Sequence, residues 1–422
     1  MKKNIKPYEI LYNATRLTYD LMDRVVVENE MVVIRTFMKH FIPMLEDFIE
    51  KSHSGLPILG YNFAFPPEIF YCFDCVPLCI EATPYIFSAL LPNGAEYFYD
   101  KSNAWGHPYH TCTSQKGIIG MCLDDNLDLD VLVSPTSPCD NAIGSYQWFS
   151  NYLNVPCVLA DLPYYYDDRS IEYFTNEFHY IIEQLSEVLD QEPDYDKMKD
   201  AVRNSRKAHE HLLEIHEMRK IVPSPIESMA NPVIAAATTF MGGRPEKVEF
   251  FKEIVDRIKY RVKHQLSRPG FEKLRSIWPY MSIFYDFGFY DFLDREIGLS
   301  QLFDIFNYYF YEPIYSNKID EIMKDLATQA RSFPMIRQSI SYFDKLIDDC
   351  VWIVKESKAD CAIIAEHIGC KQMAAISQLL RESLREETGI PTLLLELDVG
   401  DKRMTPIASV KNQISEFVNT LL

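Results

Sequence analysis

Two stretches of the chain, far apart in sequence, follow the same plan of strand, loop, cysteine, helix, proline and strand. The first covers residues 130–161 and has Cys139 after its first apolar run. The second covers residues 360–398 and has Cys370 at the same place. Short apolar runs that alternate with helical segments are typical of parallel strands joined by helices. The plan therefore predicts an α/β fold with two related parallel-sheet domains of the Rossmann or flavodoxin-like kind.

The patterns along the chain divide it into four parts. With 422 residues, 47% of them hydrophobic, the chain is long enough to bury more than one core. Two amphipathic helices are expected before the apolar run at 361–365, and the two α/β domains are expected to face each other across a cleft. The predicted parts are a helical lead-in (1–53), a first α/β domain (54–165), a helical connector (166–244) and a second α/β domain (245–422).

Three cysteines stand where a loop leads into a predicted helix: Cys112, Cys139 and Cys370. Loops beyond the carboxyl ends of parallel strands bind ligands, and the partial positive charge of a helix start favours a thiolate. The spacing is too wide for a ferredoxin or zinc-ribbon motif. If the domains face each other, three thiolates can converge and hold a 4Fe-4S cluster with one iron lacking a cysteine ligand. Isolated buried cysteines are an equally good interpretation of the spacing alone.

The other cysteines are interpreted as packing residues. Cys72, Cys75 and Cys79 form a tighter group, but the first two are expected inside a helix and the third inside the following strand. The remaining four lie in apolar or amphipathic runs, at Cys122, Cys157, Cys350 and Cys361.

A group of three histidines occurs in the charged helical connector, at His209, His211 and His216. No cysteine or acidic cluster of ligand spacing accompanies them. We therefore expect them to lie on a solvated surface rather than to bind a metal.

The charge of the chain limits its partners. Acidic residues number 61 and basic residues 42, which gives a net charge of −19. Phosphate binding needs basic surface, so we expect neither a nucleic-acid nor an anionic-membrane partner. No apolar run is long enough for a membrane span, and the amino terminus does not resemble a signal peptide, so a cytoplasmic protein is expected. No Walker loop is present, so any ATP hydrolysis belongs to another protein.

Several short segments, taken in order, resemble the 2-hydroxyacyl-CoA dehydratase and benzoyl-CoA reductase family. The resemblance runs from about residue 55 to the end of the chain. The segments are Phe65-Pro66-Pro67-Glu68-Ile69, the Cys139-Asp140 pair, Trp148, His367-Ile-Gly-Cys-Lys-Gln372, Gly389-Ile-Pro391, and Asp398 with Asp401 and Arg403.

This resemblance implies an oxygen-sensitive heterodimer of two related subunits with a 4Fe-4S cluster in the cleft. A separate iron-sulfur ATPase, acting transiently, supplies one low-potential electron. In the dehydratases that electron turns the thioester of a 2-hydroxyacyl-CoA into a ketyl radical anion, which expels the hydroxyl group; the electron returns when enoyl-CoA is released. The chain would then be a subunit of a hydro-lyase.

Carried across by position, the resemblance implies roles for individual residues. Cys112, Cys139 and Cys370 would be the cluster ligands. Glu68, at a helix start expected to face the same cleft, would transfer a proton, although a helix-capping charge is the alternative. His367 would orient substrate or bond to the cluster, or be a structural histidine. Two further expectations are that Lys371 and Gln372 meet the CoA or the cluster, and that Asp398, Asp401 and Arg403 form an ion-pair network.

Two other functions remain open from the sequence. One is a subunit of a benzoyl-CoA reductase or of a double-cubane-cluster reductase. The other is a non-catalytic paralogue that supports its partner and passes electrons.

Overall fold

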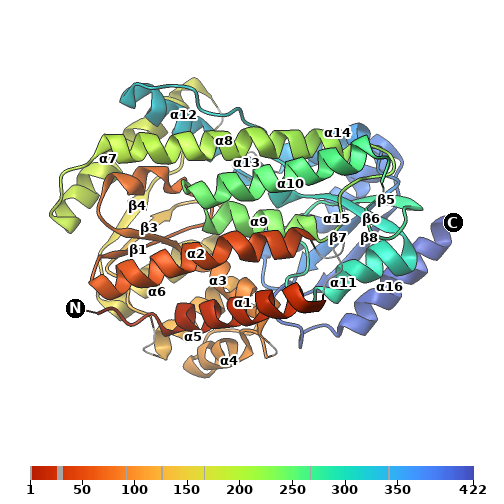
Figure 1. Cartoon of the computed structure of the whole chain (residues 1–422), viewed down its shortest axis with the longest axis horizontal. Coiled ribbons are helices and arrows are strands. Elements are labelled where there is room, and N and C mark those ends of the chain that lie inside the picture. The colour runs from red at the N-terminus through yellow and green to blue at the C-terminus, as the bar shows by residue number, and fades with distance from the viewer. Residues whose placement is uncertain are drawn as a thin grey trace.

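Two parallel sheets form the centre of the molecule (Figure 1). The computed structural model describes residues 2–25, 32–91, 93–124, 127–165, 167–266, 268–340 and 343–422. Each sheet has four strands, and every described pair of neighbouring strands is parallel. The first sheet, in spatial order, contains β2 (Val76–Cys79), β1 (Ile58–Tyr61), β3 (Val131–Pro135) and β4 (Cys157–Ala160). The second contains β6 (Leu299–Asp304), β5 (Leu274–Trp278), β7 (Cys361–His367) and β8 (Thr392–Leu397).

The two sheets have the same strand order, so the duplication predicted from the sequence is confirmed. In each sheet the chain first adds a strand on one side of the starting strand and then two strands on the other side. The starting strand and the third strand therefore flank the point where the order reverses, which is where ligands bind in open parallel sheets. Cys139 follows the third strand of its sheet, β3, and Cys370 follows the equivalent strand, β7.

The helices fall into two groups along the chain. Those up to the end of the connector are α1 (Lys6–Val25), α2 (Val32–Ser54), α3 (Thr83–Leu90), α4 (Glu96–Trp105), α5 (Thr113–Leu123), α6 (Asp140–Leu153), α7 (Asp168–Leu189), α8 (Tyr195–Arg219) and α9 (Ala230–Phe240). The later ones are α10 (Pro245–Lys263), α11 (Gly288–Asp291), α12 (Ile319–Ser332), α13 (Ile336–Ser339), α14 (Asp344–Ser357), α15 (Lys371–Thr388) and α16 (Ile407–Leu421). Short 3-10 turns η1 (Pro67–Cys72), η2 (Ile80–Ala82) and η4 (Ile305–Asn307) and a π-helical turn η3 (Phe292–Ile297) complete the elements.

Long helices join the two halves. Figure 1 shows α8, α10 and α2 running across the molecule from the side of the first sheet toward the second. α10 packs on α8 and α2, with Phe37 of α2 in an edge contact with Phe250 of α10 at 6.1 Å. Shared apolar packing of this kind fixes the two sheets relative to each other. Within the part of the chain described here, no helix is long and apolar enough to cross a membrane.

Strands β5 and β6 were not indicated by the sequence, whereas the two amphipathic helices before β7 are present as α12 and α14. Both strands are buried but carry polar residues that interrupt the apolar pattern. Arg275 of β5 donates to the carbonyl oxygen of Ser357 at 3.0 Å, and Asp304 of β6 accepts from Ser282 at 2.6 Å. Tertiary hydrogen bonds allow these side chains inside the core.

The expectation for the connector histidines is wrong for two of the three. His209 is 8% exposed and stacks on Tyr311, and His216 is 2% exposed and stacks on Tyr308. Burial lowers the pKa of His209 to about 4 and lowers the pKa of His216 as well, so both rings are neutral at pH 7. The rings are buried because helix α8 is covered on more than one side, by α10 and by the 308–311 segment. His211 remains partly exposed.

Candidate functional site

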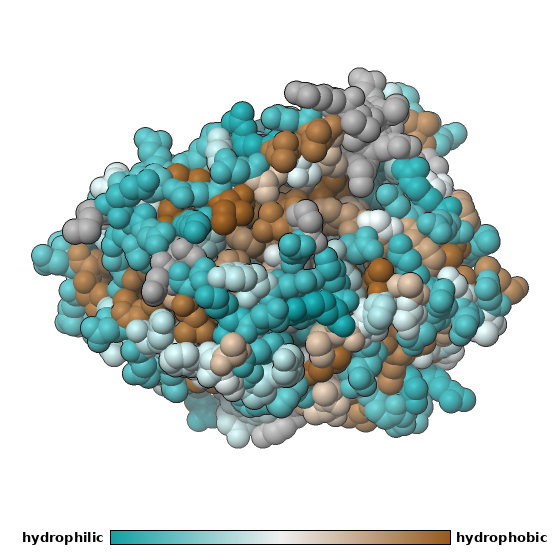
Figure 2. Space-filling model, turned by 90° about the horizontal axis from the view of Figure 1, so that it is seen from below, coloured by the Kyte–Doolittle hydropathy of each residue, from teal (hydrophilic) through white to brown (hydrophobic). Residues whose placement is uncertain are grey.

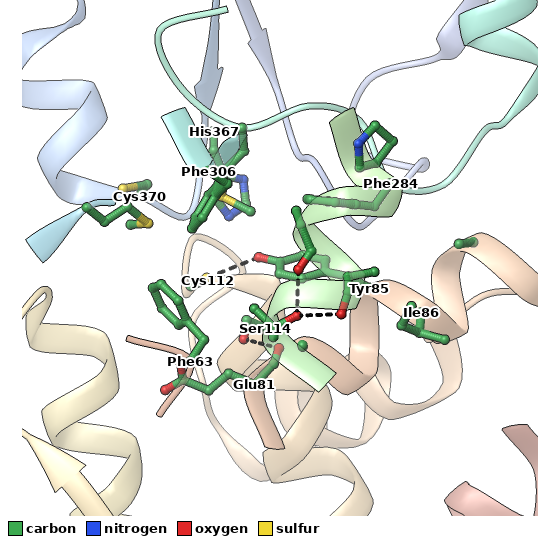
Figure 3. A pocket seen from close by; sticks show the side chains of 18 of the residues that line it. Phe63, Glu81, Tyr85, Ile86, Cys112, Ser114, Phe284, Phe306, His367 and Cys370 are labelled. Carbon is green, nitrogen blue, oxygen red and sulfur yellow. Dashed lines mark hydrogen bonds between the residues drawn. The ribbon is translucent and has the colours of Figure 1, made fainter. Parts of the chain in front are cut away.

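The three cysteines predicted at helix starts do stand there. Cys112 immediately precedes α5, Cys139 precedes α6 and Cys370 precedes α15. All three line one large pocket between the two sheets (Figure 3). The pocket contains about 1310 Å³ of space, its open mouth included. The structure thus brings together residues that are widely separated in the chain.

Direct contacts hold the three cysteine loops against one another. The Asn141 side-chain amide donates to the carbonyl oxygen of Gly369 at 3.0 Å, which links the start of α6 to the start of α15. The Gln372 amide donates to the carbonyl oxygen of Pro138 and makes a second link between the same loops. A Cβ atom on Gly369 would lie 2.7 Å from the Cα atom of Cys112, so the backbones of these loops touch where only glycine fits.

This close approach predicts that Gly369→Ala separates two cysteine loops. Backbone atoms cannot move aside as a flexible side chain would, so we expect the free energy of unfolding to fall by about 1–3 kcal/mol. The matched control is Gly144→Ala, because Gly144 is exposed in α6 and has open space around the position of a Cβ. The control should be neutral or stabilising by about 0.5–1 kcal/mol. Urea unfolding of both variants measures this, and a Gly369→Ala chain as stable as the wild type would contradict the contact.

The Cys370 thiol is buried, Cys112 and Cys139 are partly exposed, and two of the three cysteines contact tyrosine hydroxyl groups. The Tyr280 hydroxyl donates to the Cys370 sulfur at 3.1 Å, and the Tyr85 hydroxyl lies 3.7 Å from the Cys112 sulfur. Burial raises the pKa of Cys112 to about 12 and also raises the pKa of Cys139. At Cys112 and Cys139 desolvation therefore outweighs the helix dipole, and the expected preference for a thiolate is not met at these two positions in the chain alone. A bound cation would reverse this balance, since metals bind thiolates.

The pocket offers three cysteine side chains, which are the ligands that iron-sulfur clusters take. Across the described residues there is no compact group of three histidine, cysteine, aspartate or glutamate side chains that could hold one ion. A 4Fe-4S cluster is larger, and its cysteine ligands stand further apart than the ligands of one ion. Cys112, Cys139 and Cys370 stand at the wall of one roomy, mostly apolar pocket.

His367 lines the same pocket and is 1% exposed. Its Nδ1 atom accepts from the Val399 amide at 3.5 Å and lies 3.7 Å from an Asp398 oxygen. Burial lowers the pKa of His367, so the ring is neutral. Its Nε2 atom has no hydrogen-bond partner among the residues that the structure describes. A buried ring nitrogen without a partner is uncommon in folded proteins and is a sign of a functional or structural reason for its position.

A carboxyl group that sequence reasoning missed also lines the pocket (Figure 3). Glu81 is 3% exposed; the Asn62 amide donates to both of its oxygens at 2.8 Å, and the Gln115 amide donates to one at 2.9 Å. Burial raises the pKa of Glu81 to about 7. Its position in the sequence makes Glu81 a candidate for this pocket, because Glu81 follows β2 at the same edge of the sheet at which Cys139 follows β3.

Glu68 does not face the cysteines, which corrects the expectation from sequence. It lines a separate cavity with Lys247 and His209, and its carboxylate accepts from the Ser205 hydroxyl. Helix α9 lies between the two cavities, because Ala236 lines the cysteine pocket and Thr238 lines the other. Glu68 is the second residue of the 3-10 turn η1, which packs on α8 and carries the Glu68 side chain away from the cysteines.

The remaining expectations near the end of the chain are met in part. Lys371 and Gln372 line the cysteine pocket. Arg403 pairs with Asp401 at 2.9 Å, as expected, and also with Asp100 at 3.0 Å. Asp398 does not pair with Arg403; it accepts from the Thr113 hydroxyl at 3.0 Å and so ties the last strand to the start of α5.

The tighter cysteine group is packing, as predicted. Cys72, Cys75 and Cys79 are buried in the core of the first sheet, and burial raises the pKa of each thiol above its usual value. Cys75 lies after the 3-10 turn rather than inside a helix. None of the three lines the cysteine pocket.

Comparison with known proteins identifies the family. The 2-hydroxyglutaryl-CoA dehydratase D-component family matches residues 62–421. The match covers most of the chain, so the chain belongs to this family, and the resemblance seen in the sequence is confirmed.

Similar proteins include both dehydratase and reductase subunits. A benzoyl-CoA reductase subunit of Thauera aromatica is 22% identical over 387 residues, which are 83% of this chain and 85% of that protein. The (R)-phenyllactyl-CoA dehydratase alpha subunit of Clostridium sporogenes is 24% identical over 65% of this chain and 66% of its own length. The alpha subunit of the (R)-2-hydroxyglutaryl-CoA dehydratase of Acidaminococcus fermentans is 19% identical over 69% of this chain and 60% of its own length.

Proposed function

We propose that the chain is the iron-sulfur subunit of an ATP-activated, radical 2-hydroxyacyl-CoA dehydratase. The reaction removes the 2-hydroxyl group and a C3 proton as water and leaves the 2-enoyl-CoA. The observation that carries the proposal is the meeting of Cys112, Cys139 and Cys370 in one pocket. Family membership supports it, since most of the similar proteins are named as dehydratase subunits.

Cys112, Cys139 and Cys370 would hold a 4Fe-4S cluster. When bound, the cluster supplies a route for one low-potential electron and one iron that lacks a cysteine ligand. The aromatic and aliphatic wall of the pocket excludes water from the reacting group, which protects a radical from side reactions. Tyr280 and Tyr85, which contact two of the sulfur atoms, position the ligands.

Two other side chains of the pocket have complementary roles. Loss of water needs a group that removes a proton from C3 and a group that delivers a proton to the departing hydroxyl. Glu81 suits both tasks, because a carboxyl with a pKa of about 7 exchanges protons readily at neutral pH. The neutral His367 ring, with its Nε2 atom unpaired among the described residues, would orient the substrate by a hydrogen bond to an oxygen atom.

The proposed enzyme has two protein partners. A related second subunit completes a heterodimer, and a separate iron-sulfur ATPase delivers the electron in a transient complex. The similar proteins are themselves named as subunits, which supports the first partner. We place the enzyme in the cytoplasm, where thiols stay reduced; all ten cysteines of the chain are free.

A reductase of the benzoyl-CoA type is the second candidate. It is favoured by the similarity to the Thauera aromatica benzoyl-CoA reductase subunit over 83% of this chain. The two reactions differ in their use of electrons, because dehydration returns its electron whereas ring reduction consumes electrons.

That difference makes a direct test possible. The chain is co-produced without oxygen with its second subunit and ATPase, and supplied with ATP and a 2-hydroxyacyl-CoA. We expect the 2-enoyl-CoA to accumulate with far fewer than one ATP used per product, which chromatography and an ATP assay measure. ATP use in proportion to product with an aromatic thioester would instead establish the reductase. An inactive complex on both substrates would indicate a supporting subunit.

A further inference from the structure

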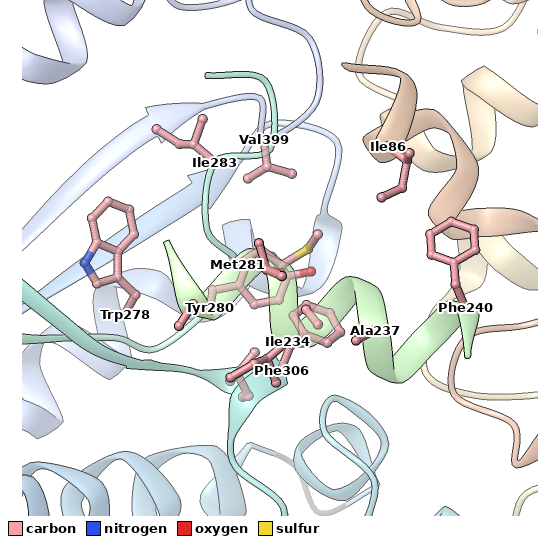
Figure 4. Close-up of a cluster of buried hydrophobic side chains, with 14 of the residues drawn as sticks. Ile86, Ile234, Ala237, Phe240, Trp278, Tyr280, Met281, Ile283, Phe306 and Val399 are labelled. Atoms are coloured by element: carbon pink, nitrogen blue, oxygen red, sulfur yellow. The ribbon is translucent and has the colours of Figure 1, made fainter. Parts of the chain in front are cut away.

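The pocket next to the cysteines is walled by apolar side chains from several segments. Ile34 and Phe37 come from α2, Ile86 from α3, Phe240 from α9, and Phe284 precedes α11. Figure 4 shows Ile86 and Phe240 close together at one end of this wall, with Met281 and Tyr280 toward the other. Figure 2 shows a patch of hydrophobic side chains that reaches into a recess of the molecular surface and is surrounded by hydrophilic ones.

Few charged groups line the pocket. Of the described lining residues, only Glu81, Asp140 and Lys371 carry a carboxyl or amino group on the side chain. Lys371 is solvent-exposed and sits directly after Cys370, at the start of α15. Figure 3 shows Cys370 and His367 on one side of the pocket and Ile86 and Phe284 on the other. Among the described lining residues, therefore, the one cation stands beside Cys370, and none stands beside Ile86 and Phe284.

Aromatic rings line much of the pocket. Tyr85 and Phe284 stack with their ring centroids 4.9 Å apart, and Phe63 meets Phe306 edge-on at 5.7 Å. These four side chains all line the pocket. Fixed ring faces offer good contact to another ring or to a branched alkyl group, and a small acyl group would leave much of this surface uncovered.

We infer that the acyl group taken by this pocket is bulky and uncharged, an aromatic or branched aliphatic 2-hydroxyacyl group, and that a dicarboxylic acyl group is rejected. Lys371, the one cationic side chain among the described lining residues, directly follows Cys370, whereas Ile86 and Phe284 lie on the other side of the pocket. A second carboxylate that left water for that apolar side would have no cation to pair with, and the loss of its hydration is larger than the gain from its contacts. A phenyl ring would instead gain from the same burial. This inference rests on the proposed function, because it assumes that a CoA thioester enters beside the cysteines.

The test measures binding and needs no turnover. Thioesters that lack the 2-hydroxyl group cannot lose water, so 3-phenylpropanoyl-CoA, glutaryl-CoA and acetyl-CoA serve as probes in equilibrium dialysis with the anaerobically purified complex. We expect 3-phenylpropanoyl-CoA to bind at least about tenfold more tightly than either other probe. Glutaryl-CoA binding as tightly as 3-phenylpropanoyl-CoA would overturn the inference and leave the proposed function standing. Absence of binding by all three probes would overturn both.

A variant locates the acyl group within the pocket. Ala236 of α9 is partly exposed into the pocket, so Ala236→Phe should fill the space that the ring needs. We expect the affinity for 3-phenylpropanoyl-CoA to fall at least about tenfold while that for acetyl-CoA stays unchanged. Leu159→Phe, at an exposed position of β4 outside the pocket, is the control and should change neither affinity. Unchanged binding of 3-phenylpropanoyl-CoA to the Ala236→Phe chain would overturn the placement.

Discussion

Serine in place of Cys112, Cys139 or Cys370 is expected to remove most of the iron from the protein. Each of these residues stands at a helix start in the wall of the same pocket, so each change deletes one of the three proposed protein ligands. Serine keeps the size of the side chain, but its alcohol is a far poorer ligand for iron than a thiolate. Iron analysis and visible absorption of anaerobically reconstituted variants measure the loss.

The matched control is Cys72→Ala. Cys72 is also buried, but it packs in the core of the first sheet and its thiol donates to the carbonyl oxygen of Ile69 at 2.8 Å. This variant should keep its iron, and far-UV circular dichroism should show that all four variants are folded. Loss of iron from the Cys72→Ala chain together with retention in Cys112→Ser would show that the ligands have been assigned to the wrong cysteines.

Replacement of Glu81 by glutamine is expected to lower turnover by roughly a hundredfold or more while iron content stays the same. Glutamine keeps the shape of the side chain and can still bond to Asn62 and Gln115, but it cannot exchange a proton. The comparison variant is Glu68→Gln, whose carboxyl lies in the separate cavity beside Lys247. It should retain nearly full turnover. A large loss in Glu68→Gln with normal turnover in Glu81→Gln would return the proton-transfer role to the residue suggested by the sequence.

The stability of the protein offers a second check on Glu81. Burial favours the protonated form of this carboxyl, and its pKa in the folded chain is about 7, above the ordinary value of a glutamate. Its contribution to stability is therefore fully present at low pH and is lost as the pH rises toward 7. Urea unfolding between pH 5 and 8 should show a weaker decline in the Glu81→Gln variant than in the wild type. Identical slopes would contradict the raised pKa.

The parts of the fold that the sequence predicted are those in which burial leaves an uninterrupted apolar run. β3 and β7 are of this kind, and the cysteine after each one marks the same point of a duplicated unit. β5 and β6 were not predicted because Arg275 and Asp304 interrupt their apolar patterns. Only tertiary hydrogen bonds make these two polar residues acceptable in a core.

The parts of the site that the sequence placed wrongly depend on contacts between distant elements. Glu68 and Glu81 both follow a strand of the first sheet, so the position that makes Glu81 a candidate holds for Glu68 as well and does not separate the two. The packing of η1 on α8 turns Glu68 away, whereas Asn62 and Gln115 hold Glu81 in the pocket wall. Likewise, the charged pattern of α8 concealed the burial of His216 against Tyr308.

The iron and acid-labile sulfide content of the wild-type chain, purified and reconstituted without oxygen and separated from its partner, tests the central claim most directly. Three cysteines around one pocket predict about four iron and about four sulfide ions per chain. About eight of each would indicate a double-cubane centre instead. A chain that binds no iron under these conditions would contradict the assignment of Cys112, Cys139 and Cys370 as the ligands of a 4Fe-4S cluster.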